Sequence, residues 1–231
     1  MMGAPVRVAG VWVTAMTVLL ASCLLAGCDS GQEKQGEAAG TSDVEALVDC
    51  VDDTRAGEAA APVSAPEGLR DALEQATGAH AGTCAVACAS ADGSWSVDVN
   101  GDEPFVSASI IKLAILGTLL DQAQSGALSL DDSVTVGPSD IVGGTGVIQA
   151  SGAGGSYTYR QLAAYMIQDS DNVATNLIID AVGMSAVNEY ASEIGLTQTA
   201  LNRRMMDFAA GDENYTSAND VAHMRQLIYQ G

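Results

Sequence analysis

The chain has 231 residues, of which 48% are hydrophobic, and a formal net charge of −20. This length fits one main domain with enough apolar residues for a core. With only 9 Lys and Arg residues, the chain lacks the clustered positive charge that nucleic-acid binding requires. We therefore expect neither nucleic acid nor an anionic membrane surface as a direct partner of the protein chain.

The first 28 residues have the pattern of a secretion signal. One basic residue, Arg7, precedes an apolar run that ends in Leu25-Ala-Gly-Cys28. This ending resembles the lipobox of bacterial lipoproteins, which implies removal of residues 1–27 and a lipid on Cys28. An uncleaved membrane anchor is the alternative, because the apolar run is almost long enough to span a bilayer. On either interpretation we expect the protein at the cell membrane, on its extracytoplasmic face.

Residues 28–66 have the composition of an acidic, flexible linker, so we expect the folded domain over residues 67–231. Cys84 and Cys88 lie in a predicted strand, four residues apart, which is too far for a disulfide between them. A bridge from Cys50 to one of them and buried free thiols are both possible outside the cytoplasm. The sequence shows no spacing of zinc ligands, so we expect neither a metal nor another cofactor.

Helical periodicity and turn residues divide the domain into helices and short strands. We expect helices at 67–77, from Ser109 to about Gln124, and at 158–167, 173–182, 185–194 and 219–229. A hairpin is expected from strands 83–90 and 94–99, with its turn at Asp92-Gly93, and a further strand at 130–136.

The Gly-rich stretch 141–155 has no lysine in the position that a phosphate-binding loop requires. The predicted hairpin would be unstable alone and would leave a sheet edge unpaired. We therefore expect further antiparallel strands after Gly231, which would complete an α+β domain.

The helix that begins near Ser109 carries the first candidate catalytic pair. Residues three apart on a helix share a face, so Ser109 and Lys112 are expected to contact each other. The surrounding residues are apolar, as in a buried helix. Burial lowers the pKa of a lysine, so a neutral Lys112 could take the proton of the Ser109 hydroxyl. The same spacing also arises by chance, with Lys112 extending to the surface.

A second polar motif, Ser170-Asp171-Asn172, precedes the helix predicted at 173–182, where Asn172 could simply act as a cap. Ser109-x-x-Lys112 followed by Ser170-Asp-Asn172 resembles the motifs of the penicillin-recognising serine hydrolases, among which the class A β-lactamases are most similar. The resemblance covers residues 67–231. It implies a helical lobe and an antiparallel sheet whose last strands would follow Gly231.

The resemblance also implies a role for each motif residue. Ser109 would attack the amide carbonyl and become acylated, with Lys112 as its base. Ser170 would pass the proton to the leaving nitrogen, and Asn172 would bind the acylamino side chain of the substrate. Asp171 is expected to fix the turn. The backbone N–H of Ser109 would be one donor to the oxyanion.

The chain departs from the family pattern in two places. The Lys-Thr-Gly motif does not occur up to Gly231, and its strand supplies a second oxyanion donor, so residues 1–231 alone are expected to have low activity. The glutamate that activates the deacylating water in class A enzymes aligns with Met205, which cannot act as a base. Asp207 or Glu213 could replace it, although Glu213 is expected to form a salt bridge.

Three functions are therefore compatible with the sequence. The first is a lipid-anchored β-lactamase that opens the β-lactam amide through a Ser109 acyl-enzyme, as in antibiotic resistance. The second is a D-Ala-D-Ala peptidase, or penicillin-binding protein, with the same residues and a persistent acyl-enzyme. The third is a non-catalytic descendant that binds cell-wall peptides.

Overall fold

The computed structural model describes residues 64–230, which lie within one unit of the chain, Thr41–Gly231. The predicted signal segment, the lipidation site Cys28 and Cys50 lie outside the described residues, as does almost all of the predicted linker. No helix among the described residues is long and apolar enough to cross a membrane.

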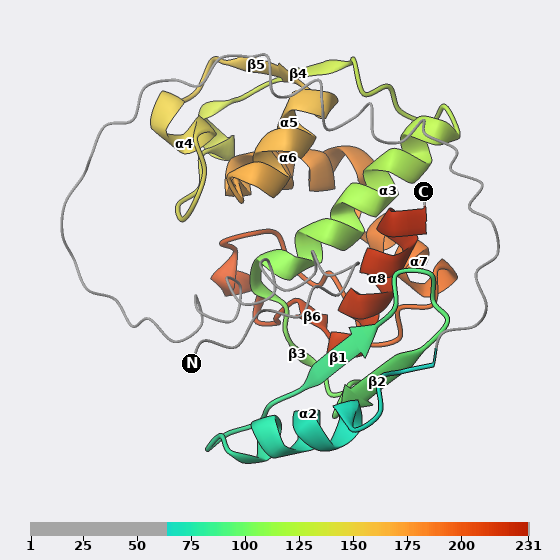
Figure 1. Ribbon diagram of the computed structural model, residues 1–231. Helices are drawn as coiled ribbons and strands as arrows, with labels where there is room; N and C mark the ends of the chain where they lie inside the picture. Colours follow the sequence, from blue (N-terminus) through green and yellow to red (C-terminus); the bar gives the residue numbers. More distant parts are fainter. Residues whose placement is uncertain (1–63, 231) are drawn as a thin grey trace, which may run out of the picture. The chain divides into compact units, whose positions relative to one another are not determined.

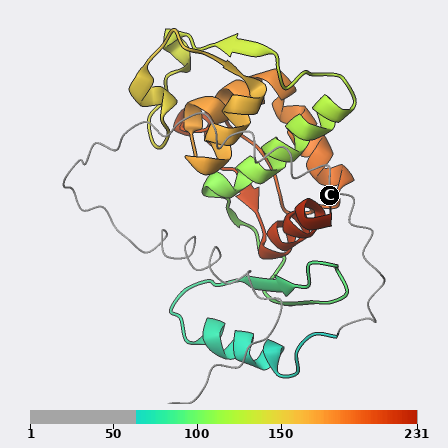
Figure 2. The same ribbon diagram turned by 45° about the horizontal axis from the view of Figure 1, so that its top comes forward.

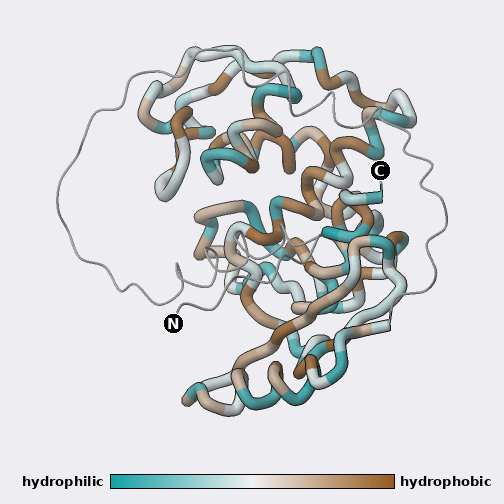
Figure 3. Tube along the Cα trace, viewed as in Figure 1, coloured by the Kyte–Doolittle hydropathy of each residue, from teal (hydrophilic) through white to brown (hydrophobic). Residues whose placement is uncertain are grey.

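A group of packed helices forms the hydrophobic core. Helix α3 (Lys112–Gln124) packs against α6 (Asn172–Val182) and α7 (Met184–Glu193), and α5 (Tyr159–Gln168) packs against α6 (Figure 1). Helix α6 is buried along nearly its whole length, and its buried residues include the polar Asn172, Thr175 and Asn176 as well as apolar side chains. Hydrophobic residues also recur along α3 (Figure 3). The largest fully buried core side chains include Ile111, Ile115, Leu119, Leu162, Met166 and Ile178.

Local signals account for the ends of these helices. Thr158 and Gln161 form a capping box at the start of α5: the Thr158 hydroxyl accepts the Gln161 N–H at 3.2 Å and the Gln161 amide accepts the Thr158 N–H at 3.0 Å. Helix α6 ends at Gly183, which has a φ of 88° that glycine adopts readily. The predicted helices at both ends of the domain are also present, as α2 (Leu69–Gly78) and α8 (Ala218–Gln230).

The segment around Ser109 differs from the single buried helix predicted there. A short 3₁₀ turn, η3 (Ala108–Ile111), contains Ser109, and α3 begins only at Lys112. The prediction missed this turn because apolar periodicity does not distinguish a 3₁₀ turn from the first turn of an α-helix. Leu120 is exposed, so α3 is also not buried on every side.

The predicted hairpin is present as β1 (Val86–Ala89) and β2 (Ser96–Val99), which pair antiparallel with Val86 opposite Val99. Helix α2 packs against β2 and α8 packs against β1, so the hairpin lies between two helices (Figure 2). Cys88, in β1, and Cys84, just before it, are both half-buried free thiols.

Two further antiparallel pairs join distant parts of the described chain. Strand β3 (Phe105–Val106) pairs with β6 (Tyr215–Thr216), and β4 (Ser133–Thr135) pairs with β5 (Ser156–Thr158). Only β4 was expected from the sequence. Short helical turns complete the connections: η4 (Pro138–Asp140), α4 (Ile148–Ser151) and η5 (Phe208–Ala210). The described residues thus form an α+β fold of packed helices and small antiparallel sheets.

Candidate active site

Ser109 lies in a strained turn directly after β3. The Ser107 N–H donates to the Asn214 carbonyl at 2.7 Å, which continues the pairing of β3 with β6. Ala108 then has a φ of 45°, in the left-handed region that residues with a Cβ rarely adopt. The 3₁₀ turn begins there, and Ser109 is exposed to solvent. The hydroxyl of Ser109 is therefore accessible to a substrate.

Lys112, in contrast, is only 2% exposed. Its Nζ donates to three oxygens: the Ser170 carbonyl at 2.6 Å, the Ser170 hydroxyl at 2.9 Å and Asn172 Oδ1 at 3.1 Å. All three acceptors are neutral. Burial lowers the pKa of Lys112 from its ordinary 10.5 to about 8, and the Asp171 carboxylate opposes this shift in part. An appreciable fraction of Lys112 is consequently neutral in mildly alkaline solution.

The Ser170 hydroxyl connects this lysine to Ser109. Ser170 Oγ lies 2.8 Å from Ser109 Oγ and accepts a hydrogen bond from Lys112 Nζ. The sequence predicted a direct contact between Ser109 and Lys112. Among the described residues no hydrogen bond joins these two side chains directly; the long lysine side chain reaches the 169–172 turn, where three acceptors satisfy its three N–H groups. The hydrogen-bonded connection between the two residues therefore passes through Ser170.

Asp171, and not Asn172, is the N-cap of α6. Its carboxylate accepts the Ala174 N–H at 2.9 Å and the Ile148 N–H at 2.8 Å, and the residue is fully buried. Asn172 is the first residue of the helix itself. The sequence did not resolve this difference, because Asp and Asn are equally good caps. Asp171 thus holds the turn between α5 and α6.

Asn172 is buried between the lysine and the Gly-rich stretch. Its Oδ1 accepts from Lys112, and its Nδ2 donates to the Gly143 carbonyl at 3.1 Å. The Thr145 hydroxyl donates to the Ser170 carbonyl at 2.7 Å, which ties the same stretch to the turn. The Asn172 amide has a second N–H, so it retains capacity to bind a substrate carbonyl.

The glycines of this stretch permit its close approach to the site. Gly144 and Gly146 have φ values of 91° and 134°. A Cβ at Gly144 would overlap the Asn172 amide, and one at Gly146 would overlap the Asp171 side chain. The sequence excluded a phosphate-binding loop here but did not show what the glycines do. They allow bare backbone to pack against the Ser170-Asp-Asn172 motif.

Residues 201–207 form a loop on another side of the site, and its backbone is held by α6. Met205 N–H donates to Asn176 Oδ1 at 2.8 Å, and Asn176 Nδ2 donates to the Met205 carbonyl at 3.1 Å. Asn176 lies one helical turn after Asn172, on the same face. Sequence reasoning missed Asn176, although its spacing from Asn172 was a usable signal. The Met205 side chain itself is buried, at 9% exposure.

Asp207 and Glu213, the two carboxylates proposed to replace the missing glutamate, are not hydrogen-bonded to the catalytic candidates in the part of the chain that the structure describes. Glu213 forms an ion pair with Arg203, with its Oε2 2.6 Å from Arg203 Nη2. Asp207 is exposed, and its N–H donates to the Arg204 carbonyl at 3.3 Å. Among the hydrogen bonds of residues 64–230, none joins either carboxylate to the catalytic candidates.

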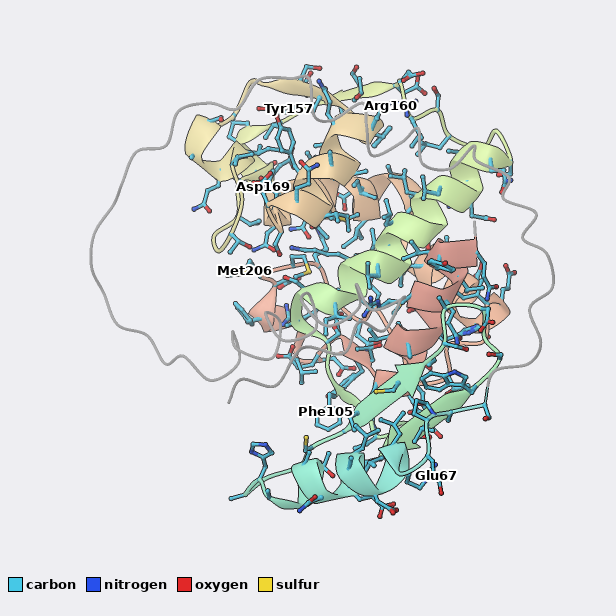
Figure 4. The ribbon with its side chains drawn as sticks, viewed as in Figure 1. Glu67, Phe105, Tyr157, Arg160, Asp169 and Met206 are labelled. Carbon is cyan, nitrogen blue, oxygen red and sulfur yellow. The ribbon has the colours of Figure 1, made fainter. Side chains whose placement is uncertain are left out.

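The following residue, Met206, lies on the part of this loop that faces the Gly-rich stretch (Figure 4). Its thioether is a neighbour of Gly143 and Gly144, and the residue as a whole is 36% exposed. Within residues 64–230 no group of three or more His, Cys, Asp or Glu side chains is placed to hold a metal ion. The site instead gathers an exposed serine hydroxyl, a buried amine and a hydroxyl that bridges them, which are groups that nucleophilic catalysis uses.

Comparison with known proteins agrees with this geometry. The sequence profile of the Beta-lactamase enzyme family matches residues 68–231, and the chain belongs to this family. A β-lactamase of Rhodobacter capsulatus is 34% identical over 128 residues, which are 54% of this chain and 43% of that protein. The extended-spectrum β-lactamase PER-1 of Pseudomonas aeruginosa is 27% identical over 170 residues, or 70% and 55% of the two chains.

Solved structures show the same fold. The β-lactamase of Sphaerobacter thermophilus matches with a TM-score of 0.63 and 29% identity, over 71% of this chain and 62% of that one. PBP-A matches with a TM-score of 0.62 and 30% identity, over 68% and 60%. A leucine-to-glutamate mutant of PBP-A, solved as an acyl-enzyme with penicillin G, also matches, with a TM-score of 0.63. The chain spans less than two thirds of each of these proteins.

Proposed function

We propose that this protein is a serine hydrolase that reacts with β-lactams through an acyl-enzyme on Ser109. The observation that carries the proposal is the continuous connection from buried Lys112 through the Ser170 hydroxyl to exposed Ser109, at 2.9 and 2.8 Å. A nucleophile needs a nearby base whose pKa suits the working pH. Lys112, with a pKa of about 8, meets that requirement.

The proposed acylation moves one proton along this connection. When Lys112 is neutral, its nitrogen accepts the Ser170 proton while Ser170 takes the proton of Ser109. The Ser109 oxygen then forms a bond to the carbonyl carbon, and the backbone N–H of Ser109 stabilises the oxyanion. The carbon–nitrogen bond of the lactam breaks as Ser170 gives its proton to the leaving nitrogen. Ser170 recovers a proton from Lys112, and Asn172 binds the acylamino group.

Release of the acyl group is the step that this site supports least. The side chain at position 205 is a thioether, which cannot activate a water molecule, and Asp207 and Glu213 have no hydrogen bond to the motif residues. The acyl-enzyme should therefore persist. This favours, as a second candidate, a penicillin-binding protein that cuts D-Ala-D-Ala peptides, in line with the similarity to PBP-A.

Labelling with a fluorescent penicillin tests the proposal on the full-length protein. We expect a covalent adduct that is absent in Ser109→Ala and forms at least about a hundredfold more slowly in Lys112→Arg, because arginine stays protonated. Rapid turnover identifies a β-lactamase, and a stable adduct identifies a penicillin-binding protein. An equal adduct in Ser109→Ala would disprove the mechanism. No adduct in the native protein would leave the non-catalytic, peptide-binding function.

We further propose that a lipid on Cys28 holds the protein at the extracytoplasmic face of the membrane. The support is the lipobox-like Leu25-Ala-Gly-Cys28 ending of the apolar run. Metabolic labelling with a fatty-acid analogue should mark the native protein and not Cys28→Ala. Equal labelling of both proteins would contradict lipidation at this residue.

A further inference from the structure

Met206 has an unusual backbone conformation for a residue with a large side chain. Its φ of 68° lies in the left-handed region, which persists only where the surroundings hold it. On one side, Asn176 fixes both backbone groups of Met205. On the other, the Asp207 N–H bonds to the Arg204 carbonyl. The turn buries the Met205 side chain and leaves that of Met206 at the surface.

The exposed thioether lies beside the Gly-rich stretch and the Asn172 amide. A Cβ added to Gly144 would be 3.2 Å from Met206 Sδ and 3.6 Å from its terminal methyl group. The same Cβ would overlap Asn172 Nδ2. Met206 and Asn172 are therefore neighbours that together occupy the space a side chain at position 144 would fill. The 201–207 loop therefore places an apolar side chain, that of Met206, next to the Asn172 amide.

Phe208, the first large apolar residue after the 201–207 loop, has a different contact. The Phe208 ring is covered by the Arg203 guanidinium, whose carbon lies 4.8 Å from the ring centre. Arg203 is itself paired with Glu213. Phe208 thus contacts Arg203, whereas the Met206 thioether lies beside Gly144 and Asn172.

We propose that Met206 determines specificity by contacting the acyl substituent of the substrate. The inference rests on the proposed function, in which Asn172 binds the acylamino group. Atoms just beyond that amide would then lie against the Met206 thioether. A methionine is flexible and polarizable, and it packs well against aromatic rings. The preferred substrates are therefore β-lactams whose acyl group carries an aromatic or other apolar substituent close to the amide.

Two β-lactams, one with and one without an acyl substituent, distinguish a contact between Met206 and that substituent from a general disturbance of the active site. Benzylpenicillin carries a phenylacetyl group on its amide, and 6-aminopenicillanic acid has no acyl group. In Met206→Gly, which suits the positive φ and so retains the turn, acylation by benzylpenicillin should slow about tenfold, a size typical of losing small apolar contacts. Acylation by 6-aminopenicillanic acid should stay unchanged. Met206→Leu, of similar volume, should keep most of the native rate with both compounds.

Leu120→Ala is a matched control, because Leu120 is 40% exposed, similar to Met206, but lies in α3 near its C-terminal end. It should alter neither rate. An equal slowing with both compounds in Met206→Gly would overturn the proposal and make Met206 structural. Unchanged rates with both would overturn it as well. If the native protein forms no adduct with either compound, the proposed function fails and this inference fails with it.

Discussion

The turn that carries Ser170 and the loop that carries Met205 are both fixed to α6, but they differ in their chemistry. In the turn, buried Lys112 is bonded to three oxygens and connected to an exposed nucleophile. In the loop, Asn176 holds the backbone of Met205 with two hydrogen bonds, and the side chain held there cannot accept a proton. The loop thus holds the backbone at position 205 in place without supplying a side chain that can act as a base. In the proposed function, the groups that acylate are already connected to one another, whereas the loop holds no base at position 205 for release of the acyl group.

Met205→Glu should produce the largest change, because the frame for a base already exists. A carboxyl group at this buried position should have a raised pKa and activate water, which accelerates release of the acyl group about 10²- to 10⁴-fold. The measurement is the lifetime of the fluorescent penicillin adduct. Met205→Gln, of the same shape but without a base, is the control. Equal lifetimes in the two variants would show that the loop does not present position 205 to the acyl group.

The pH dependence of acylation should reveal Lys112, the proposed base that is hydrogen-bonded to the turn. Below a pH of about 8 most of Lys112 is protonated, so the acylation rate should rise with pH and level off above about 8. The slope at lower pH should approach tenfold per pH unit, as for a single general base. Stopped-flow labelling between pH 6 and about 9.5 measures this profile. A rate independent of pH across the range would exclude Lys112 as the base.

The same titration predicts a smaller effect on stability. The pKa of Lys112 is lowered in the folded protein, so between about 8 and 10.5 the unfolded chain binds more protons than the folded one. Stability should therefore gain a contribution as pH rises through this window, and the cost of burying the charge should be fully present below it. Lys112→Met should remove that contribution, as measured by chemical denaturation at several pH values. An unchanged pH dependence in this variant would contradict the shift.

Asn176→Ala should weaken the loop and leave the turn intact. The substitution leaves the buried N–H and carbonyl of Met205 without partners, at about 1–3 kcal/mol for each group. We expect a clearly lower melting temperature but an acylation rate within about threefold of the native value, because the bonds of Lys112 and Ser170 remain. If acylation falls as sharply as it does in Lys112→Arg, the two regions are not independent.

The sequence predicted local structure, such as helices and the hairpin, better than contacts between distant parts of the chain. Helical periodicity, capping residues and the Asp92-Gly93 turn identified the main helices and the hairpin. The pairing of β3 with β6 was not predictable in this way, because two-residue strands show no alternation and their partners lie far apart in the chain. Glycine spacing likewise gave no sign that bare backbone packs against Asn172.

The sequence predicted which residues form the candidate site, but it did not predict the hydrogen bonds that connect them. Ser109, Lys112, Ser170 and Asn172 do come together, as the two motifs indicated. The route from Lys112 to Ser109 through Ser170 depends on the path of a long side chain, which residue spacing does not determine. Similarly, the cap at Asp171 depends on where the helix starts within a run of polar residues.

The buried Asp171 carboxylate has a mechanical consequence. It bonds at once to the first turn of α6 and to the start of α4, at Ile148, and no side chain fits between it and Gly146. The Gly-rich stretch cannot swing away from the 169–172 turn without exposing an unpaired buried anion. In the proposed function, the Gly-rich stretch would therefore form a fixed side of the substrate site.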